Sequence, residues 1–421
     1  MINKVKGTYD LLPSDIYIWQ YLEKFIKELY QKYNYKEIRT PIFEYSNLFH
    51  RDNEHSDMVT KETYNFKDKG NRDLTLRPEG TAGVLRSYIE NKLYANNRLV
   101  KLFYIGPNFR YERPQKGRFR QFMQFGVETL GSNDYLIDVE IIKLAFETVK
   151  QLGLKQYILK INTLGDKQSK TNFEKALVNY LTPFYNELSF DSKERLTKNP
   201  LRILDSKDPN DLKIIKNAPS LKDYLSDKSK ESFENITKML TSLKIDYEID
   251  YKLVRGLDYY SDTVFEILST NPNFGSQTAL VGGGRYNSLV KELGGPEIPG
   301  IGFAFGMERL VESIKLEEIS LPKEKTLDAY FITFDPKTKK EAFKLQALLR
   351  DNGFITDLNY LNSSFKSQLK EALSEEAKYL IIIGEDELNE NKVTVKDTKL
   401  ETQEKVKIDN LVSYLKEKLN V

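Results

Sequence analysis

The chain has 421 residues, a length typical of about two to four domains, and its formal net charge is only +2. A hydrophobic fraction of 40% and a charged fraction of 30% exclude a disordered chain and fit an ordinary globular protein. No segment approaches the roughly 18 apolar residues of a membrane span, and the N-terminal MINKVKGTYDLLPSD lacks the apolar core of a secretion signal. We therefore expect a cytoplasmic protein without a membrane partner, in which any polyanion is bound by a local basic patch.

Cysteine is absent and only two histidines occur, His50 and His55. The absence of cysteine excludes disulfides and thiol catalysis and agrees with a reducing compartment. With so few soft ligands, a metal ion is expected to be Mg²⁺ held by carboxylates and substrate phosphates, not by a dedicated protein site. Both histidines lie in the polar stretch FHRDNEHSDM, which is typical of a surface loop; a serine–histidine triad is the alternative.

The N-terminal region begins with an amphipathic helix. After the sequence LLP, Ser14 is expected to cap a helix whose apolar residues recur at helical spacing from Ile16 to Tyr33. The stretch YKEIRTPIFEY, residues 35–45, predicts a short strand, and Pro41 within it indicates a sheet edge or an interface.

The segment LTLRPEGTAGVLRSY, residues 74–88, predicts a turn followed by a helix. Pro78 fixes the turn, and Glu79, Gly80 and Thr81 follow it. These residues are candidates for binding a ligand, and an ordinary helix start with an acidic first turn is the alternative.

Residues 109–128, FRYERPQKGRFRQFMQFGVE, concentrate positive charge. Five cationic side chains fall within eleven positions: Arg110, Arg113, Lys116, Arg118 and Arg120. A strand period of two places six of these residues on one polar face, namely Arg118, Arg120, Phe122, Gln124, Gly126 and Glu128. The preceding strand contributes Arg110 and Glu112 to the same face. The pattern predicts a hairpin with a basic loop, and an aromatic side chain next to a glycine suits a flat ligand; a solvated sheet face is the alternative.

The middle of the chain changes in character. Residues 134–152 predict a helix, and YILKINTLGD predicts a strand that ends at Gly165. Residues 167–250 are lysine-rich, poor in glycine and mostly helical in pattern, which indicates an inserted helical module.

Glycine-rich segments follow the module. VRGLDYY brings together Arg255, Tyr259 and Tyr260, with a structural tyrosine corner as the alternative. GGGRY, residues 282–286, fits neither the P-loop nor the GxGxxG pattern. In GIGFAFGMER one strand face carries almost no side chains, and Arg309 starts the next helix; such a strand admits a planar group or a closely packed helix.

A charged linker, residues 315–325, precedes the C-terminal region. Strands (DAYFITF, FITDLNY, YLIIIG and KVTVKD) then alternate with helices, which predicts a small separate α/β domain.

Taken in this order, the segments resemble the class II aminoacyl-tRNA synthetases, and the histidyl-tRNA synthetase family in particular. IRTPIFE is similar to motif 1, FRYE with FRQFMQFGVE to motif 2, and GIGFAFGMERL to motif 3. LVRGLDYY and GGGRYNSL resemble the two histidine signatures, and LRPEGT, LRILDSK and IIIGEDELNENKVTVKD also match. One departure is the stretch RDNEHSDMV, which lacks the glycine of the family's Gly-Glu-x-Thr-Asp-type loop.

The resemblance implies an α/β fold: an α+β catalytic core on an antiparallel sheet, a helical insertion, and a small C-terminal α/β anticodon-binding domain. The corresponding ranges are 1–166 and 251–320 for the core, 167–250 for the insertion and 326–421 for the last domain. The implied activity is that of a histidine–tRNA ligase. It activates L-histidine with ATP, accompanied by Mg²⁺, and transfers histidine to the 3′ end of tRNA(His). A cytoplasmic homodimer with its contact at motif 1 is also implied.

The resemblance also implies roles for single residues. Arg110, Glu112, Arg118, Phe122 and Arg309 would bind ATP, with Phe122 and Arg309 on either side of the adenine and Arg309 also near the γ-phosphate. Histidine would be bound by Glu79, Gly80, Thr81, Arg110, Gln124, Glu128, Arg255, Tyr259 and Tyr260. Arg110, Arg255 and Arg309 would be catalytic, and Arg113, Gln115 and Lys116 would meet the acceptor end of the tRNA.

Two other identities fit parts of the pattern. A regulatory paralogue binds histidine without catalysis as a subunit of ATP phosphoribosyltransferase, but such paralogues typically lack the last domain and the catalytic arginines. A synthetase for proline, threonine or glycine is disfavoured by RGLDYY and by the histidine-type insertion. Threonine enzymes also use cysteine and histidine as zinc ligands, which this chain cannot supply.

Overall fold

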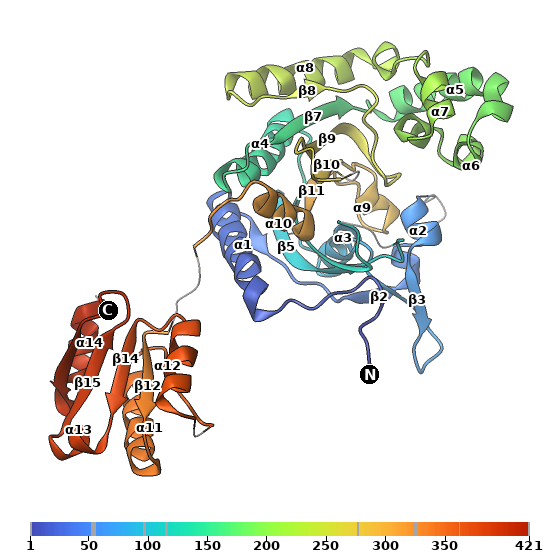
Figure 1. The fold of residues 1–421 in the computed structure, drawn as a ribbon. Helices are drawn as coiled ribbons and strands as arrows, with labels where there is room; N and C mark the ends of the chain where they lie inside the picture. Colours follow the sequence, from blue (N-terminus) through green and yellow to red (C-terminus); the bar gives the residue numbers. More distant parts are fainter. Residues whose placement is uncertain are drawn as a thin grey trace. The chain divides into compact units, whose positions relative to one another are not determined.

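The computed structural model describes residues 2–51, 56–95, 98–113, 117–275, 278–322, 327–361 and 363–419. The chain forms two compact units, Met1–Leu321 and Pro322–Val421, each with its own apolar core. Figure 1 shows the first unit in blue to orange and the second in orange to red. Each unit is described by itself below.

A large, mostly antiparallel sheet is the centre of the first unit. Its spatial order is β1-β5-β6-β11-β10-β9-β7-β8; neighbours are antiparallel from β5 to β7, and the two outer pairs are parallel. The strands are β1 (Lys36–Glu37), β5 (Val100–Phe109), β6 (Gln121–Leu130), β7 (Tyr157–Thr163), β8 (Glu248–Ile249), β9 (Ser261–Ser269), β10 (Ala279–Arg285) and β11 (Gly300–Gly306). The glycine run of GGGRY is therefore part of a strand and not a phosphate-binding loop.

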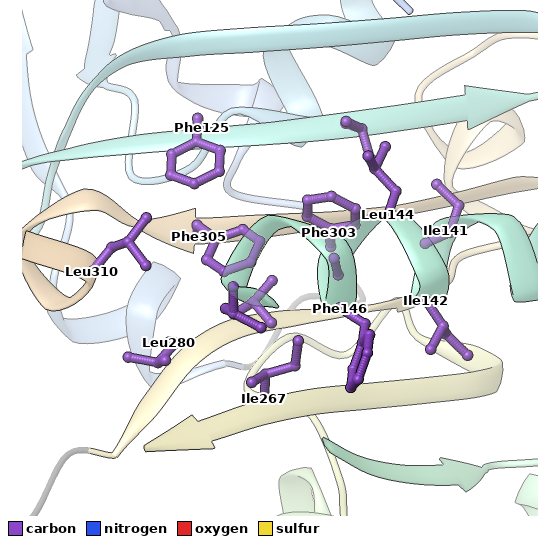
Figure 2. Packing of buried hydrophobic residues seen from close by; sticks show 14 of the residues in the cluster. Phe125, Ile141, Ile142, Leu144, Phe146, Ile267, Leu280, Phe303, Phe305 and Leu310 are labelled. Carbon is purple, nitrogen blue, oxygen red and sulfur yellow. The ribbon is translucent and has the colours of Figure 1, made fainter. Parts of the chain in front are cut away.

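The apolar face of this sheet is covered by helices α1 (Pro13–Lys32), α4 (Tyr135–Gln151) and α10 (Met307–Leu316). Figure 2 shows side chains of α4 packed against Phe303 and Phe305 of β11, with Phe125 of β6 beside them. The rings of Phe125 and Phe305 stack with centroids 4.8 Å apart. Alternate residues of the strands thus point into the core, and the other half is available on the opposite face.

Two local expectations in the N-terminal region were wrong. Helix α1 starts at Pro13, and its N-cap is Leu12 without a side-chain cap; Ser14 already lies inside the helix. The ring of Pro13 presets the helical φ at a position where no N–H bond is needed, so the helix begins earlier than a serine cap would allow. The stretch 35–45 is not one strand but two short ones, β1 in the large sheet and β2 in another, with Pro41 between them.

A small antiparallel sheet, in the order β2-β4-β3, lies beside the large one. It consists of β2 (Phe43–Tyr45), β3 (Tyr64–Lys67) and β4 (Asp73–Leu76). The nearby helical segments are η1 (Ser46–Leu48), α2 (Asp57–Lys61), α3 (Thr81–Glu90) and α9 (Leu289–Glu292). The turn between β4 and α3 carries Glu79 and Gly80, and Thr81 is the first helical residue, in agreement with the sequence pattern.

Residues 167–242 are mostly helical in the structure. The elements are α5 (Lys167–Leu181), η2 (Thr182–Glu187), α6 (Phe190–Lys198), η3 (Pro200–Asp205), α7 (Pro209–Ile215), η4 (Leu221–Tyr224) and α8 (Asp227–Ser242). Side chains of Asp166, Ser189, Asp208 and Ser226 cap four of the α-helices. The chain then returns to the large sheet through β8, which pairs with β7.

The second unit is a five-stranded sheet in the order β13-β12-β14-β15-β16, parallel in its first three strands and antiparallel in the rest. The strands are β12 (Ala329–Thr333), β13 (Thr356–Leu358), β14 (Tyr379–Ile383), β15 (Lys392–Asp397) and β16 (Gln403–Lys407). The helical segments are α11 (Pro336–Asp351), α12 (Phe365–Ser374), α13 (Glu385–Asn389), η5 (Ile408–Asn410) and α14 (Leu411–Leu419). The sequence missed β16, because only Val406 of this strand is buried. The predicted linker begins later than expected, since Lys315 and Leu316 still belong to α10.

Candidate active site

A cavity of about 330 Å³ lies on the face of the large sheet opposite the helices. Its walls come from β5, β6, β9, β10 and β11, from the starts of α3 and α10, from the segment around Arg255, and from η3 of the inserted module. The predicted polar strand face therefore lines a cavity and is not a solvated surface. The two ends of this cavity differ in chemistry.

One end is a cluster of buried carboxylates and hydroxyl groups. The hydroxyl of Thr81 donates to Oε1 of Glu128 at 2.7 Å, and that of Tyr286 donates to Oε2. The hydroxyl of Tyr259 donates to Oε2 of Glu79 at 2.8 Å. Glu79 and Glu128 are 6% and 1% exposed, so a ligand bound here has little competition from water. We call these five residues the acidic end of the cavity.

Burial dominates the ionisation of the acidic end. It raises the pKa of Glu128 to about 8, although the hydrogen bonds from Tyr286 and Thr81 favour the charged form. Burial also raises the pKa of Tyr259 and Tyr286 well above the ordinary value for tyrosine, and the neighbouring carboxylates act in the same direction. At neutral pH these tyrosines are hydrogen-bond donors, and Glu128 takes up and releases a proton near that pH.

The glycines of this face have a different role from the one the sequence suggested. A side chain at Gly302 would place its Cβ 2.1 Å from Oε2 of Glu128, and one at Gly126 would lie 2.6 Å from the hydroxyl of Tyr104. Gly80 likewise leaves room for the ring of Tyr104, which its Cβ would approach to 2.2 Å. These three glycines therefore make space for the protein's own side chains and not for a flat ligand.

The other end of the cavity is rich in guanidinium groups. Arg110 donates to the backbone oxygen of Pro78 at 2.9 Å, and its guanidinium carbon lies 5.1 Å from the ring centroid of Phe122. Arg118 forms an ion pair with Glu112 at 3.0 Å. Arg309 donates to the backbone oxygen of Ala279 at 2.7 Å. We call this region, which comprises Arg110, Glu112, Arg118, Phe122 and Arg309, the basic end.

Arg255 lies between the two ends. Its guanidinium forms a short ion pair with Glu266 and lies 5.6 Å from the ring centroid of Tyr260. Burial opposes the charge of Arg255, but Glu266, Tyr260 and Tyr259 together outweigh this effect, and the pKa of Arg255 is raised. A Cβ at Gly282 would lie 1.8 Å from Nη2 of Arg255, so the glycine of GGGRY provides the space for this guanidinium.

The structure brings most of the predicted site residues into one cavity, but some lie elsewhere. Gln124 lines the cavity and accepts a hydrogen bond of 2.7 Å from Asn108. Arg120 does not line it: its guanidinium carbon lies 3.9 Å from the ring centroid of Tyr111. Because β6 begins only at Gln121, strand alternation does not apply to Arg120. Arg113 is exposed, whereas Gln115 and Lys116 fall outside the described residues, as does His55.

Sequence reasoning missed several residues of the cavity, among them Tyr104, Tyr286, Glu266, Arg202 and Asp205. Strand alternation places Tyr104 on the same face as Arg110, but the sequence pattern assigned it no role in the site. Tyr286 and Glu266 become neighbours of the site only through the order of strands in the sheet. In GGGRY, the arginine itself is structural, since Arg285 forms a buried ion pair with Asp138 of α4.

No group of three or more carboxylates and histidines that could hold a metal ion occurs among the described residues. His50 lies on the surface, where Nε2 is 3.3 Å from both the side-chain oxygen of Asn65 and the hydroxyl of Thr63. Within the part of the chain that the structure describes, no helix is long and apolar enough to cross a membrane.

Comparison with known proteins decides the family. Residues 7–310 match the family model described as histidyl-tRNA synthetase. A histidine–tRNA ligase from Acholeplasma laidlawii is 60% identical over 416 residues, which cover 99% of both chains. The chain belongs to the histidyl-tRNA synthetase family. As a member, it is an aminoacyl-tRNA synthetase, a histidine–tRNA ligase, and the activity and family expected from the sequence are confirmed.

The structural comparisons agree with membership of the histidyl-tRNA synthetase family. The crystal structure of apo S. aureus histidyl-tRNA synthetase superimposes with a TM-score of 0.85 at 42% identity, covering 99% of this chain and 100% of that one. Residues 328–418 match the anticodon-binding domain model, which confirms the predicted fold class together with the synthetase core. A B. halodurans protein titled as an ATP phosphoribosyltransferase regulatory subunit/histidyl-tRNA synthetase has a TM-score of 0.65 at 21% identity, and this likeness concerns the fold alone.

Proposed function

We propose that the cavity carries out both steps of histidine–tRNA ligation. In the first, L-histidine reacts with ATP to form histidyl-adenylate and pyrophosphate; in the second, histidine passes to the 3′ end of tRNA(His). The observation that carries this proposal is the polarity of the single cavity. An acidic, hydroxyl-lined end suits an amino acid with N–H donors, and a guanidinium-rich end suits a triphosphate.

Histidine is bound at the acidic end. The carboxylates of Glu79 and Glu128 accept from its N–H groups, Thr81 and Gln124 add polar contacts, and Tyr259 and Tyr260 close around the imidazole. We now assign Gly80 an indirect role, because it packs against the ring of Tyr104 and is not among the residues that line the cavity.

ATP is bound at the basic end. Arg110 holds the α-phosphate, with Glu112 and Arg118 nearby, and the adenine stacks between Phe122 and Arg309. The guanidinium of Arg110 lies over the ring of Phe122. We therefore expect this guanidinium to move toward the phosphate when the adenine enters.

Arg255 connects the two substrates. It donates to the histidine carboxylate and to the α-phosphate together, since a guanidinium is planar and always charged. A carboxylate oxygen of histidine attacks the α-phosphorus, the bond to the oxygen bridging the β-phosphate breaks, and pyrophosphate leaves. The nucleophile is already an anion, so the protein supplies orientation and fixed positive charge and needs no general base.

Mg²⁺ accompanies ATP and is held by its phosphates. Two carboxylates of the cavity, Glu112 at the basic end and Glu266 beside Arg255, are each engaged with an arginine, Arg118 and Arg255 respectively. This pairing supports an ion that arrives with the nucleotide and not a dedicated protein site. The ion screens the charge of the triphosphate.

The tRNA contacts two regions in this proposal. The loop with Arg113, Gln115 and Lys116 meets the acceptor end, and residues 326–421 bind the anticodon stem. The catalytic core is formed by residues 1–166 and 251–320, interrupted by the insertion at 167–250. Deletion of the second unit is expected to leave adenylate formation largely intact and to reduce tRNA charging strongly.

The enzyme is proposed to act as a cytoplasmic homodimer. The segment between β1 and β2 and its neighbours expose several large apolar side chains, at 43–54%: Ile42, Phe43, Tyr45 and Phe66. A second copy would cover this patch and the proline-containing edge at Pro41. Light scattering that shows a fully active monomer near 49.0 kDa at micromolar concentration would contradict the dimer.

ATP–pyrophosphate exchange assayed with each of the twenty amino acids tests the proposal directly. We expect exchange with histidine alone. Exchange with another amino acid, or none with any, would overturn the assignment of the acidic end.

A further inference from the structure

The inserted module reaches into the active-site cavity, although neither its sequence nor its helical character suggested this. The segment LRILDSK folds as η3, and the side chains of Arg202 and Asp205 form part of the cavity wall. The remaining members of η3 point the other way: Leu201, Ile203 and Leu204 are buried in the core of the module. The apolar side chains of this short 3-10 helix are therefore anchored in the module, whereas Arg202 and Asp205 line the cavity.

The module is also fastened to the segment that carries Arg255 and the two tyrosines. Lys170 of α5 donates to the backbone oxygens of Asp258 and Tyr260, at 3.1 Å each. The side chain of Asn199, just before η3, donates a short hydrogen bond to the carboxylate of Asp258. These contacts fix the position of η3 relative to the segment that carries Arg255, Tyr259 and Tyr260.

Arg202 lies beside the Arg255–Glu266 pair. A Cβ at Gly256 would be 3.6 Å from its Nη1, so no side chain separates Arg202 from the backbone next to Arg255. Burial raises the pKa of Glu266, and Asp205 acts in the same direction, whereas the charges of Arg255, Arg309 and Arg202 oppose the rise. Arg202 also faces Asp205 at 3.5 Å and keeps 21% of its side chain exposed. Its guanidinium is therefore accessible to an anion in the cavity.

We propose that Arg202 binds the β- and γ-phosphates of ATP, so that the inserted module completes the triphosphate site. The inference rests on the proposed function, because it takes ATP as the ligand of the basic end. Arg255 is assigned to the α-phosphate and Arg309 to the adenine, and Arg202 lines the same cavity, so its guanidinium is available for the phosphates that leave as pyrophosphate. Its charge stabilises the oxygen that becomes anionic when the bond to the α-phosphorus breaks.

The test uses the full-length enzyme with Arg202→Ala, Arg202→Lys and, as a matched control, Arg195→Ala. Arg195 is an arginine of the same module, on α6, and does not line the cavity. In histidine-dependent ATP–pyrophosphate exchange, Arg202→Ala is expected to raise KM for ATP about tenfold or more, as for the loss of a charge-assisted hydrogen bond. KM for histidine should change less than twofold, Arg202→Lys should restore part of the loss, and Arg195→Ala should behave as the parent enzyme.

Three results would overturn the proposal. The first is an unchanged KM for ATP in Arg202→Ala. The second is normal exchange with slower transfer from preformed histidyl-adenylate, which would assign Arg202 to the tRNA end. The third is a loss in Arg202→Lys as large as in Arg202→Ala together with a lowered Tm, which would mean a structural role. These results differ from a failure of the proposed function itself, in which the parent enzyme would show no histidine-dependent exchange.

Discussion

The two ends of the cavity differ in how their charged side chains are paired and buried. At the acidic end, every carboxylate already accepts a hydrogen bond from a hydroxyl group of the protein, and burial is nearly complete. At the basic end, arginines are bound mainly to backbone oxygens or to one carboxylate, and several remain partly exposed. A network whose groups are all paired resists adjustment, whereas a set of long cationic side chains can regroup around a charged ligand.

This difference separates selectivity from rate. A buried acceptor penalises any amino acid that cannot donate to it, because the unpaired group keeps the full cost of desolvation. Fixed positive charge does not distinguish amino acids, but it stabilises the charge that develops on the phosphates. Mutations at the basic end should therefore lower the rate for the correct substrate, and mutations at the acidic end should lower the preference for histidine.

The largest effect is expected for Arg255→Ala. Loss of one preorganised donor of this kind typically costs about 10²- to 10³-fold in rate, roughly 3 to 4 kcal/mol. Adenylate formation should slow by at least this factor, while transfer from preformed adenylate should be affected much less, since the chemistry at the α-phosphate is then complete. Arg255→Lys should recover only part, because it keeps the charge but not the planar fork. Pre-steady-state measurement of each half-reaction gives both rates.

Equal slowing of the two steps in Arg255→Ala would contradict the separation of selectivity at the acidic end from rate at the arginines. Arg255 would then shape the whole pocket, through Glu266 and Tyr260, and would have no specific part in activation. Glu266→Gln is a useful second variant, since it removes the partner of the ion pair and leaves the guanidinium in place.

Glu79→Ala should act at the other end. The mutation leaves the hydroxyl of Tyr259 without its acceptor and removes one acceptor from the ligand. We expect kcat/KM for histidine to fall about 10²-fold, roughly 2.7 kcal/mol, with KM for ATP nearly unchanged. Glu90→Ala, on the exposed part of α3, is the control. Near-normal histidine-dependent exchange in Glu79→Ala would remove this residue from the site.

The sequence predicted much of the site because strand periodicity is local. Alternation alone placed Phe122, Gln124 and Glu128 on one face, and the order of the motifs added Glu79 and Arg309. Alternation failed where the strand had not yet begun, at Arg120. Helix ends were also predicted only approximately, as the start at Pro13 shows.

The pairings inside the acidic end were not predictable in the same way. Tyr286 and Glu128 are 158 positions apart, and they meet because β10 and β6 both flank β11. The carboxylate of Glu128 occupies the space beside Gly302, which the sequence pattern suggested as room for a ligand. Arg202 was missed for a related reason: the alternation of polar and apolar residues in η3 does not show which part of the sheet its polar side chains will face.

The smallest effect concerns the proton on Glu128. Burial raises its pKa to about 8 in the unliganded enzyme, whereas the tyrosines around it stay neutral. The folded state therefore binds more protons than the unfolded one between the ordinary glutamate pKa of 4.5 and about 8. Stability should consequently fall as pH rises through this window. Asp262, with a pKa raised to about 6 by burial, contributes only to its lower part.

Burial also raises the pKa of Glu174, Glu266 and Glu308, so it is the comparison of the parent with Glu128→Gln that isolates Glu128 in the range from pH 6.5 to 8. Tm of the free enzyme should decrease across it, and Glu128→Gln, which cannot titrate, should flatten that decrease. Histidine binding should show the opposite slope, because N–H donors favour the ionised carboxylate. Between pH 7 and 8 the ionised fraction rises about fivefold, so KM for histidine should fall by about that factor, above the range where free imidazole titrates. Parallel pH profiles in the parent and in Glu128→Gln would mean that Glu128 keeps one charge state, and that selectivity at the acidic end does not involve its proton.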